Sequence, residues 1–388
     1  MINITKLWCN QPGSMDKLRY SNDAHKRPVV VWNSTRQCNL HCMHCYSQSE
    51  NKLYPNELST EEAKHFISDL AAFNVPVLLF SGGEPLMRHD LFELAKFASN
   101  LGIRPVMSTN GTLITTETAE KIKQVGFHYV GVSLDGVGQT NNKFRGAPDA
   151  FERAVEGIRN CISAGIRTGL RLTVSKYNYD DVSAIFDFIE TEKIPRVCFY
   201  HLAYAGRGTN IAKDDLTHEQ SRQFMDLLLT KAEEFQQKKL DTEILTVDNH
   251  ADAAYIYLKT KEKDPERAKQ IMQLLQLNGG NSSGQGIGCV DFNGYVHPDQ
   301  FWQHYNIGNI REKPFSQIWQ DNNEPLLQQL RNRKSLLKGK CSICNFLNIC
   351  NGNLRVRPEA VYNDIWAQDP ACYLTEKETQ QPVDKQHD

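Results

Sequence analysis

Three cysteines stand close together near the N-terminus, in the stretch CNLHCMHCY. The cysteine loop, as we name residues 38–46, contains Cys38, Cys42 and Cys45. Closely spaced thiolates are typical metal ligands, and three of them leave a bound metal or cluster with an open coordination position. A zinc ion completed by His41 or His44 would close that position, whereas a [4Fe–4S] cluster on three thiolates keeps it open. The spacing therefore predicts a reactive metal centre and favours the cluster.

A second group of cysteines lies near the C-terminus with the spacing C-x2-C-x5-C-x21-C, and its members are Cys341, Cys344, Cys350 and Cys372. Four thiolates can close a tetrahedral zinc site, which the spacing alone favours, and they can also hold a [4Fe–4S] cluster. Disulfides are improbable for either group in a cytosolic chain, where thiols are kept reduced. The other four of the eleven cysteines are scattered, and two of them, Cys161 and Cys198, fall in periodic segments as expected for small core residues.

The 388 residues carry a formal net charge of −2, which gives no electrostatic reason to expect binding to nucleic acid or to an anionic membrane. No apolar run approaches the length that spans a bilayer, and the N-terminal stretch lacks the features of a signal peptide. We therefore expect a cytoplasmic protein without membrane or nucleic-acid partners.

Six β-branched or aromatic runs alternate with helical segments between residues 29 and 205, and they cover 29–33, 76–82, 104–109, 128–134, 169–175 and 196–202. Such alternation predicts parallel strands joined by right-handed crossovers, with the active site at the carboxyl ends of the strands. The expected fold class is α/β, a partial (β/α)6 barrel followed by a small C-terminal iron–sulfur domain.

The chain divides into five expected parts, which are an N-terminal extension (1–28), the partial barrel (29–240), a helical linker region (241–285), an auxiliary cluster domain (286–376) and a disordered tail (377–388). Within the fourth part, the sequence VDFNGYVHPD predicts a hairpin that turns at Asn293 and Gly294.

The cysteine loop with Tyr46 after its third cysteine resembles the signature of the radical S-adenosylmethionine (SAM) superfamily. SGGEPL at 81–86 follows the second strand, where this superfamily has a GGEP motif that contacts the methionine amino group of SAM. STNGT at 108–112 and SLDG at 133–136 end the next two strands, and Ser133 with Asp135 can bond ribose hydroxyls. The resemblance implies two cofactors, SAM and a [4Fe–4S] cluster bound to three cysteines and SAM. The SAM-binding residues it implies are Tyr46, Gly82, Gly83, Glu84, Pro85, Asn110, Ser133, Asp135 and Arg171.

The resemblance further implies reductive cleavage of SAM to methionine and a 5′-deoxyadenosyl radical, which takes a hydrogen atom from the substrate. A low-potential electron donor of the ferredoxin or flavodoxin type is the implied partner. The four C-terminal cysteines resemble an auxiliary [4Fe–4S] site of the SPASM class of extensions. Leu354 and Asp299 stand where a full SPASM pattern has further cysteines, so we expect one auxiliary cluster, with zinc as the alternative.

Long stretches at 201–208, 296–312 and 350–374 resemble the NirJ and AhbC group, which modifies side chains of the iron tetrapyrrole 12,18-didecarboxysiroheme. In that group acetates are removed on the way to haem, or propionates on the way to haem d1. A substrate with several carboxylates needs cations, and a planar macrocycle needs apolar walls. The candidate substrate residues are Arg145, His201, Arg207, His297, His304, Arg355 and Arg357, with Phe301, Trp302 and Tyr305 as walls.

Two other classes of protein fit parts of the sequence. A SPASM-type peptide maturase would share the cofactors and act on a ribosomal peptide. An iron–sulfur electron-transfer protein would use both cysteine groups but would leave the GGEP and SLDG stretches without a role.

Overall fold

A single ten-stranded sheet organises the computed structural model, which describes residues 1–13, 16–20 and 27–383. Its strand order is β1-β8-β7-β6-β5-β4-β3-β2-β9-β10, and every neighbouring pair from β9 through β2 to β8 is parallel. The strands are β1 (Ile2–Asn3), β2 (Val29–Thr35), β3 (Val77–Gly82), β4 (Arg104–Thr109), β5 (Tyr129–Ser133), β6 (Thr168–Val174), β7 (Arg196–His201), β8 (Glu243–Val247), β9 (Ile287–Val290) and β10 (Val296–His297).

The six predicted strands are present as β2 to β7, parallel and in chain order, which confirms the α/β class. Two further parallel strands extend the sheet beyond the prediction, β8 beside β7 and β9 beside β2. The helical linker region expected over 241–285 contains two helices and, at its start, the strand β8. That strand has only five residues and follows a long polar helix, so its sequence pattern is too short to stand out.

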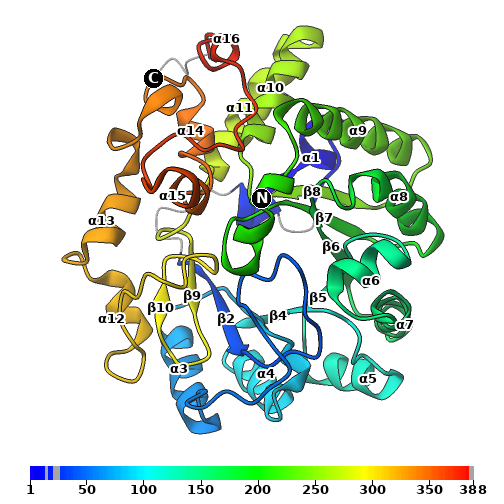
Figure 1. Ribbon diagram of the computed structural model, residues 1–388, viewed down its shortest axis with the longest axis vertical. Coiled ribbons are helices and arrows are strands. Elements are labelled where there is room, and N and C mark those ends of the chain that lie inside the picture. The colour runs from blue at the N-terminus through cyan, green and yellow to red at the C-terminus, as the bar shows by residue number, and fades with distance from the viewer. Residues whose placement is uncertain (14–15, 21–26, 384–388) are drawn as a thin grey trace.

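Helices pack around the outside of the curved sheet (Figure 1). Ser59 and Glu62 form the predicted capping box at the start of α3. The α-helices are α1 (Ile4–Cys9), α2 (Asp16–Arg19), α3 (Thr60–Ala72), α4 (Leu91–Asn100), α5 (Thr116–Val125), α6 (Gln139–Arg145), α7 (Ala150–Ser163), α8 (Val182–Thr191), α9 (His218–Gln237), α10 (Ala251–Lys263), α11 (Pro265–Asn278), α12 (Phe315–Gln320), α13 (Pro325–Arg331), α14 (Leu347–Cys350), α15 (Val356–Tyr362) and α16 (Glu376–Thr379).

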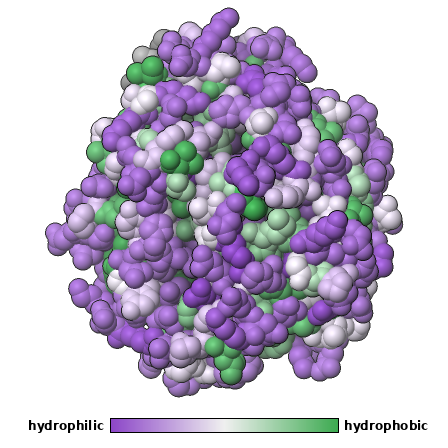
Figure 2. Space-filling model, in the orientation of Figure 1, coloured by the Kyte–Doolittle hydropathy of each residue, from purple (hydrophilic) through white to green (hydrophobic). Residues whose placement is uncertain are grey.

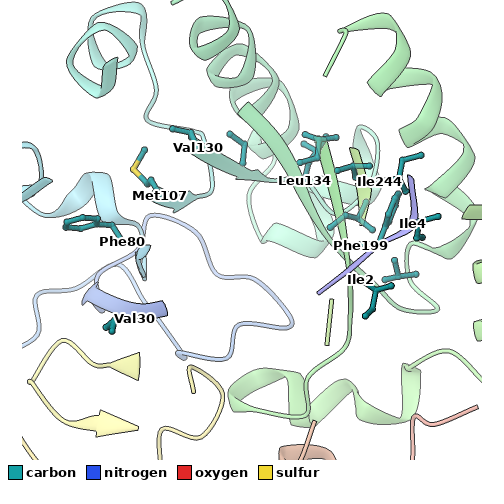
Figure 3. Close-up of a cluster of buried hydrophobic side chains, with 14 of the residues drawn as sticks. Ile2, Ile4, Val30, Phe80, Met107, Val130, Leu134, Phe199 and Ile244 are labelled. Carbon is teal, nitrogen blue, oxygen red and sulfur yellow. The ribbon is translucent and has the colours of Figure 1, made fainter. Parts of the chain in front are cut away.

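Residues 2–9 belong to the body of the fold rather than to an appended N-terminal extension. β1 pairs antiparallel with β8, and the backbone N–H of Ile244 donates to Thr5 Oγ1 at 2.8 Å. Figure 3 shows Ile2 and Ile4 beside Phe199 and Ile244 in the core. Burying these apolar side chains fixes the N-terminal segment against the sheet, which the sequence analysis did not anticipate.

The predicted hairpin joins the C-terminal segment to the barrel. β9 pairs antiparallel with β10, with Val290 opposite Val296, and β9 also pairs parallel with β2. Gly294 has a φ of 86° at the predicted turn, a conformation that glycine adopts without strain. The C-terminal segment therefore continues the same sheet that carries the cysteine loop, and its helices lie along one side of the barrel (Figure 1).

The expected disorder of the tail is wrong for residues 377–383. Thr375 caps α16, the Arg222 guanidinium pairs with Glu378 at 2.7 Å, and the backbone N–H of Asn345 donates to the Thr379 carbonyl at 2.8 Å. These long-range contacts hold a polar segment that has no hydrophobic periodicity of its own. Residues 384–388 lie outside the described residues.

Within the described ranges, no helix is long and apolar enough to cross a membrane. The face shown in Figure 2 is mainly hydrophilic, with apolar residues in small scattered groups.

Candidate active site

A cavity opens at the carboxyl ends of the parallel strands, the edge predicted to carry the active site. Eleven of the predicted site residues line it: Cys38, Cys42, Cys45, Tyr46, Gly82, Gly83, Asn110, Ser133, Arg145, Arg171 and His201. The fold therefore brings together residues that lie up to 163 positions apart in the sequence (38 to 201).

The cysteine loop is held in place by main-chain hydrogen bonds to α6. The N–H of His41 donates to the Arg145 carbonyl at 3.2 Å, and that of Met43 donates to Phe144 at 3.0 Å. Arg207 braces the loop from the other side, because its Nε donates to the Cys42 carbonyl at 2.8 Å. The loop is therefore pre-shaped by the protein rather than by a bound metal alone.

The buried thiols of the loop need nearby positive charge, such as that of a metal cluster, to ionise. Burial raises the pKa of Cys38 to about 12 and also raises that of Cys42. Arg145 opposes this effect, since its Nη1 lies 3.6 Å from Cys42 Sγ while its Nε has no partner. A buried guanidinium with a free donor beside the thiols fits an anionic thiolate cluster.

A single metal ion fits the loop less well. His41 is exposed, and His44 Nε2 lies 3.8 Å from Asp135 Oδ2. The exposed His41 is not placed to complete a buried zinc site, whereas a cluster on three thiolates needs no fourth protein ligand.

Gly82 and Gly83 allow two loops to meet at the edge of the cavity. A Cβ on Gly82 would lie 2.3 Å from the Thr35 carbonyl oxygen, and one on Gly83 would lie 2.1 Å from that of Gln37. Gly82 also has a φ of 120°, which side-chain-bearing residues rarely adopt. The glycines therefore bring the backbone of β3 against the segment that leads into the cysteine loop.

Glu84 lies behind the cavity wall, where it joins β3 to β4. Its carboxylate accepts hydrogen bonds from Thr109 Oγ1 at 2.7 Å, from the N–H of Asn110 at 2.7 Å and from the N–H of Leu86 at 3.1 Å. The carboxylate is fully buried, which raises its pKa. Glu84 positions Asn110, and the predicted contact of Glu84 and Pro85 with SAM is not made by side chains that line the cavity.

Asp135 is also buried away from the cavity, which corrects its predicted bond to ribose. It forms an ion pair with Arg145, and its Oδ1 accepts from the N–H of Thr173 at 2.7 Å. Ser133, two residues earlier, does line the cavity at the end of β5. The SLDG stretch therefore presents one polar side chain to the cavity and uses the other to hold Arg145.

Tyr46 and Asn110 are fixed by the protein at the cavity surface. The Tyr46 hydroxyl donates to Asn33 Oδ1 at 3.1 Å and lies 3.1 Å from Ser81 Oγ. Asn110 Nδ2 donates to Asn39 Oδ1 at 2.8 Å and lies 3.9 Å from Cys38 Sγ. Both side chains therefore link strand ends to the cysteine loop in orientations set before any ligand binds.

Three arginines predicted to bind substrate serve the fold instead. Arg207 braces the cysteine loop and is absent from the cavity lining. Arg357 is fully buried, pairs with Asp369 at 2.8 Å and donates to two main-chain carbonyls. Arg355 is 1% exposed and donates to the carbonyls of residues 365 and 367. A buried arginine has the same sequence signature as an exposed one, so sequence reasoning could not separate them.

The three predicted histidines lie in different surroundings. His201 lines the cavity, with its Nε2 3.0 Å from Asp252 Oδ2. His297 is fully buried, and its Nδ1 lies 2.9 Å from the Tyr305 carbonyl, so it cannot meet a substrate. His304 is half exposed and lines a second cavity.

The predicted aromatic residues divide in the same way. Phe301 lines both cavities, whereas Trp302 is buried and donates from its Nε1 to Glu359 at 2.7 Å. Tyr305 packs against Trp302, with ring centroids 5.6 Å apart. Phe301 is therefore the wall residue that the structure supports.

The four C-terminal cysteines lie close to one another. Burial raises the pKa of Cys350, and the thiols of Cys372, Cys341 and Cys344 raise it further. Arg355 lies near this group, with its Nε and Nη2 buried and without hydrogen-bond partners. Unpaired buried guanidinium donors beside four thiols fit an anionic iron–sulfur cluster.

Protein contacts fill the positions where a further auxiliary cluster would need cysteines. Leu354 packs with Phe301 and Trp302 in an apolar cluster. Asp299 accepts from the N–H of Phe301 at 2.8 Å, and Cys289 Sγ lies 3.6 Å from Asn33 Nδ2. These contacts agree with a single auxiliary cluster.

Sequence reasoning missed several residues of the cavity, namely Thr173, Tyr200, Asp248 and Gln300. Thr173 and Tyr200 lie near the carboxyl ends of predicted strands, and these ends were expected at the active-site edge. Their places in the strands could therefore have identified them as cavity residues. Asp248 follows the unpredicted strand β8, and Gln300 follows the hairpin, so neither carried a signal.

Comparison with known proteins defines the class of the protein. The chain matches the radical SAM superfamily over residues 32–189 and an iron–sulfur cluster-binding SPASM domain over residues 283–345. Its structure is similar to that of SuiB from Streptococcus suis bound to S-adenosylmethionine, with a TM-score of 0.71, 19% identity and coverage of 90% of this chain and 78% of that chain. The cofactors are SAM, its [4Fe–4S] cluster and an auxiliary iron–sulfur site.

Two relatives narrow this class. The chain is 54% identical to the Fe-coproporphyrin III synthase of Methanosarcina barkeri, over 97% of this chain and 98% of that protein. It is 42% identical to the pre-heme d1 synthase of Dinoroseobacter shibae, over 91% of this chain and 88% of that protein. The chain belongs to the radical SAM superfamily and, within it, to the family of these synthases.

Proposed function

We propose that this enzyme removes acetate side chains from 12,18-didecarboxysiroheme and so forms Fe-coproporphyrin III. The observation that carries the proposal is the 54% identity, over nearly the whole of both chains, to a protein named Fe-coproporphyrin III synthase. The identity to the pre-heme d1 synthase is lower, at 42%, which favours acetate over propionate as the group removed.

We call the cavity at the carboxyl ends of the strands the inner cavity and the second cavity, which His304 lines, the outer cavity. The inner cavity suits SAM and the reacting side chain of the substrate. Cys38, Cys42 and Cys45 would hold the cluster there, and Gly82, Asn110 and Ser133 would contact SAM. When bound, the cluster and SAM supply a radical that abstracts hydrogen, while the protein orients the reactants and excludes water.

We place the macrocycle in the second, outer cavity, which adjoins the first. The two cavities share Tyr46, Ser47 and Phe301 in their linings. The rings of Tyr46 and Phe301 meet edge to face, with centroids 5.5 Å apart. These two rings would support the edge of the macrocycle where its side chain reaches from the outer cavity into the inner one.

His304 is the histidine best placed to approach the substrate iron. Its Nε2 lies 2.9 Å from Glu359 Oε1, and this bond raises the pKa of His304. A carboxylate partner on one ring nitrogen is the usual arrangement of an imidazole that binds metal with the other. Nδ1 would then be the atom that meets the iron.

Anaerobic titration with 12,18-didecarboxysiroheme tests the substrate class, with formation of 5′-deoxyadenosine from SAM and dithionite as a second readout. We expect a saturable change in the visible spectrum and faster formation of 5′-deoxyadenosine. His304→Ala should alter the spectrum of the bound tetrapyrrole, whereas His218→Ala, at an exposed histidine outside both cavities, should not.

Two results would contradict the proposal. SAM cleavage without tetrapyrrole binding, together with a mass change in a candidate peptide, would indicate a peptide maturase. Reduction of a partner protein without any SAM cleavage would indicate an electron carrier.

A further inference from the structure

Asp248 occupies a strained position at the surface of the inner cavity. It follows β8 directly and has a φ of 69°, a left-handed conformation that is uncommon outside glycine. The next two residues fix it, because the N–H of His250 donates to Asn353 Oδ1 at 2.8 Å and Asn249 Nδ2 donates to the Ala371 carbonyl at 3.0 Å. Backbone strain held in this way is concentrated at functional sites.

One oxygen of the Asp248 carboxyl group, the buried Oδ2, has no hydrogen-bond partner among the described residues. Arg357 donates at 2.7 Å to the main-chain carbonyl of Asp248, while its charge is paired with Asp369. Arg357 therefore supports the backbone of Asp248 and leaves its Oδ2 available to a ligand.

A cation without an ion-pair partner faces the same cavity. In the described ranges, the Arg171 guanidinium has no carboxylate partner, and it lies 4.6 Å from the centroid of the Tyr200 ring. Arg171 lies opposite Cys198 across β6 and β7, and Tyr200 lies opposite Val247 across β7 and β8. Arg171 lies in the middle of β6, Tyr200 near the end of β7 and Asp248 directly after β8, so the three residues come from adjacent strands.

The electrostatic surroundings keep Asp248 close to protonation at neutral pH. Burial raises its pKa to about 6, and Asp299 raises it further. Arg357, the amino group of Met1 and Arg171 act in the opposite direction.

We propose that Arg171 and Asp248 form a subsite for one side-chain carboxylate of the tetrapyrrole, in which the guanidinium supplies the charge and the carboxyl group, in its acid form, donates a hydrogen bond. This inference rests on the proposed function and assigns Arg171 to the substrate rather than to SAM. An ionised Asp248 would repel the carboxylate, whereas the neutral acid bonds to it. The subsite therefore selects a carboxylate at the wall formed by β6, β7 and β8.

Anaerobic spectral titrations with 12,18-didecarboxysiroheme at several pH values test the subsite. Only the protonated form of Asp248 binds well, so the dissociation constant of the wild type should rise by up to roughly 50-fold from about pH 6 to about pH 8. Substrate carboxylates stay ionised over this range, since their ordinary pKa is about 4. Asp248→Asn cannot ionise but keeps an N–H donor, so it should bind equally well at both pH values.

Arg171→Gln is the matched variant: it should weaken binding at every pH and move the pH-dependent rise in the dissociation constant to higher pH, because Arg171 lowers the pKa of Asp248. A flat profile in the wild type, or an unchanged slope in Asp248→Asn, would overturn the subsite and leave the proposed function intact. Loss of SAM cleavage in Asp248→Asn without tetrapyrrole present would assign the carboxyl group to SAM and also overturn it. If the wild type bound no tetrapyrrole at all, the proposed function itself would fail.

Discussion

Replacement of Arg357 by methionine should destabilise the protein strongly, because the structure uses this arginine as a brace between β7, β8 and the C-terminal segment. Its guanidinium pairs with Asp369 at 2.8 Å and donates to the carbonyls of Leu202 at 2.8 Å and Asp248 at 2.7 Å. Breaking a buried ion pair costs about 3 to 5 kcal/mol, and two unpaired carbonyls add about 1 kcal/mol or more. We expect a loss of about 4 to 6 kcal/mol in the free energy of unfolding.

The measurement is anaerobic urea denaturation of the reconstituted protein. Asp369→Asn in the Arg357→Met background should recover part of the loss, since it removes the uncompensated charge and keeps the bond that Asp369 Oδ1 accepts from the N–H of Ala371. Arg171→Gln is the control, because Arg171 makes no ion pair in the described part of the chain, and its cost should stay within about 1 kcal/mol. A cost below about 1 kcal/mol for Arg357→Met would refute the brace and restore Arg357 as a substrate residue.

Four other outcomes follow from the site. Cys38→Ala should abolish 5′-deoxyadenosine formation, and activity near that of the wild type would contradict the assignment of the cysteine loop. Reconstituted protein should hold about eight irons, with Cys341→Ala lowering the count towards about four, whereas about four irons with one zinc in the wild type would contradict an auxiliary cluster. Arg207→Ala should reduce SAM cleavage even without substrate, because Arg207 holds the cysteine loop in place. An effect on tetrapyrrole affinity alone would indicate that Arg207 binds the substrate instead. The hydrogen bond and ion pair with Arg311 lower the pKa of Glu62 to about 2, below its ordinary 4.5. The difference in unfolding free energy between the wild type and Arg311→Gln should therefore be present above about pH 4.5 and vanish as the pH falls to about 2. A difference that persists at about pH 2 would contradict a stabilising role for this ion pair.

The site residues that could be predicted from the sequence are those that lie at the carboxyl end of a strand whose pattern is recognisable. The cysteine loop follows β2, Gly82 ends β3, Asn110 follows β4 and Ser133 ends β5, and all of them line the cavity. Parallel strands place their carboxyl ends at one edge, so the order of elements was enough to bring these residues together.

The remainder depended on long-range contacts that leave no local pattern. Arg207 and Arg357 bond main-chain carbonyls more than 150 residues away, and nothing near them in the sequence indicates those partners. Glu84 and Asp135 belong to recognisable motifs, but their burial behind the wall arises from packing between strand ends. Asp248 escaped notice because β8 is short and because its conformation is fixed by the C-terminal segment, through Asn353.

The mass of the tetrapyrrole product tests the central claim most directly. Reconstituted enzyme, SAM, dithionite and 12,18-didecarboxysiroheme are incubated without oxygen, and the extracted macrocycle is analysed by mass spectrometry. The account predicts a product lighter by two acetate groups, with its propionates retained and with 5′-deoxyadenosine formed alongside. A product that had lost propionates, or an unchanged macrocycle after SAM had been cleaved, would contradict it.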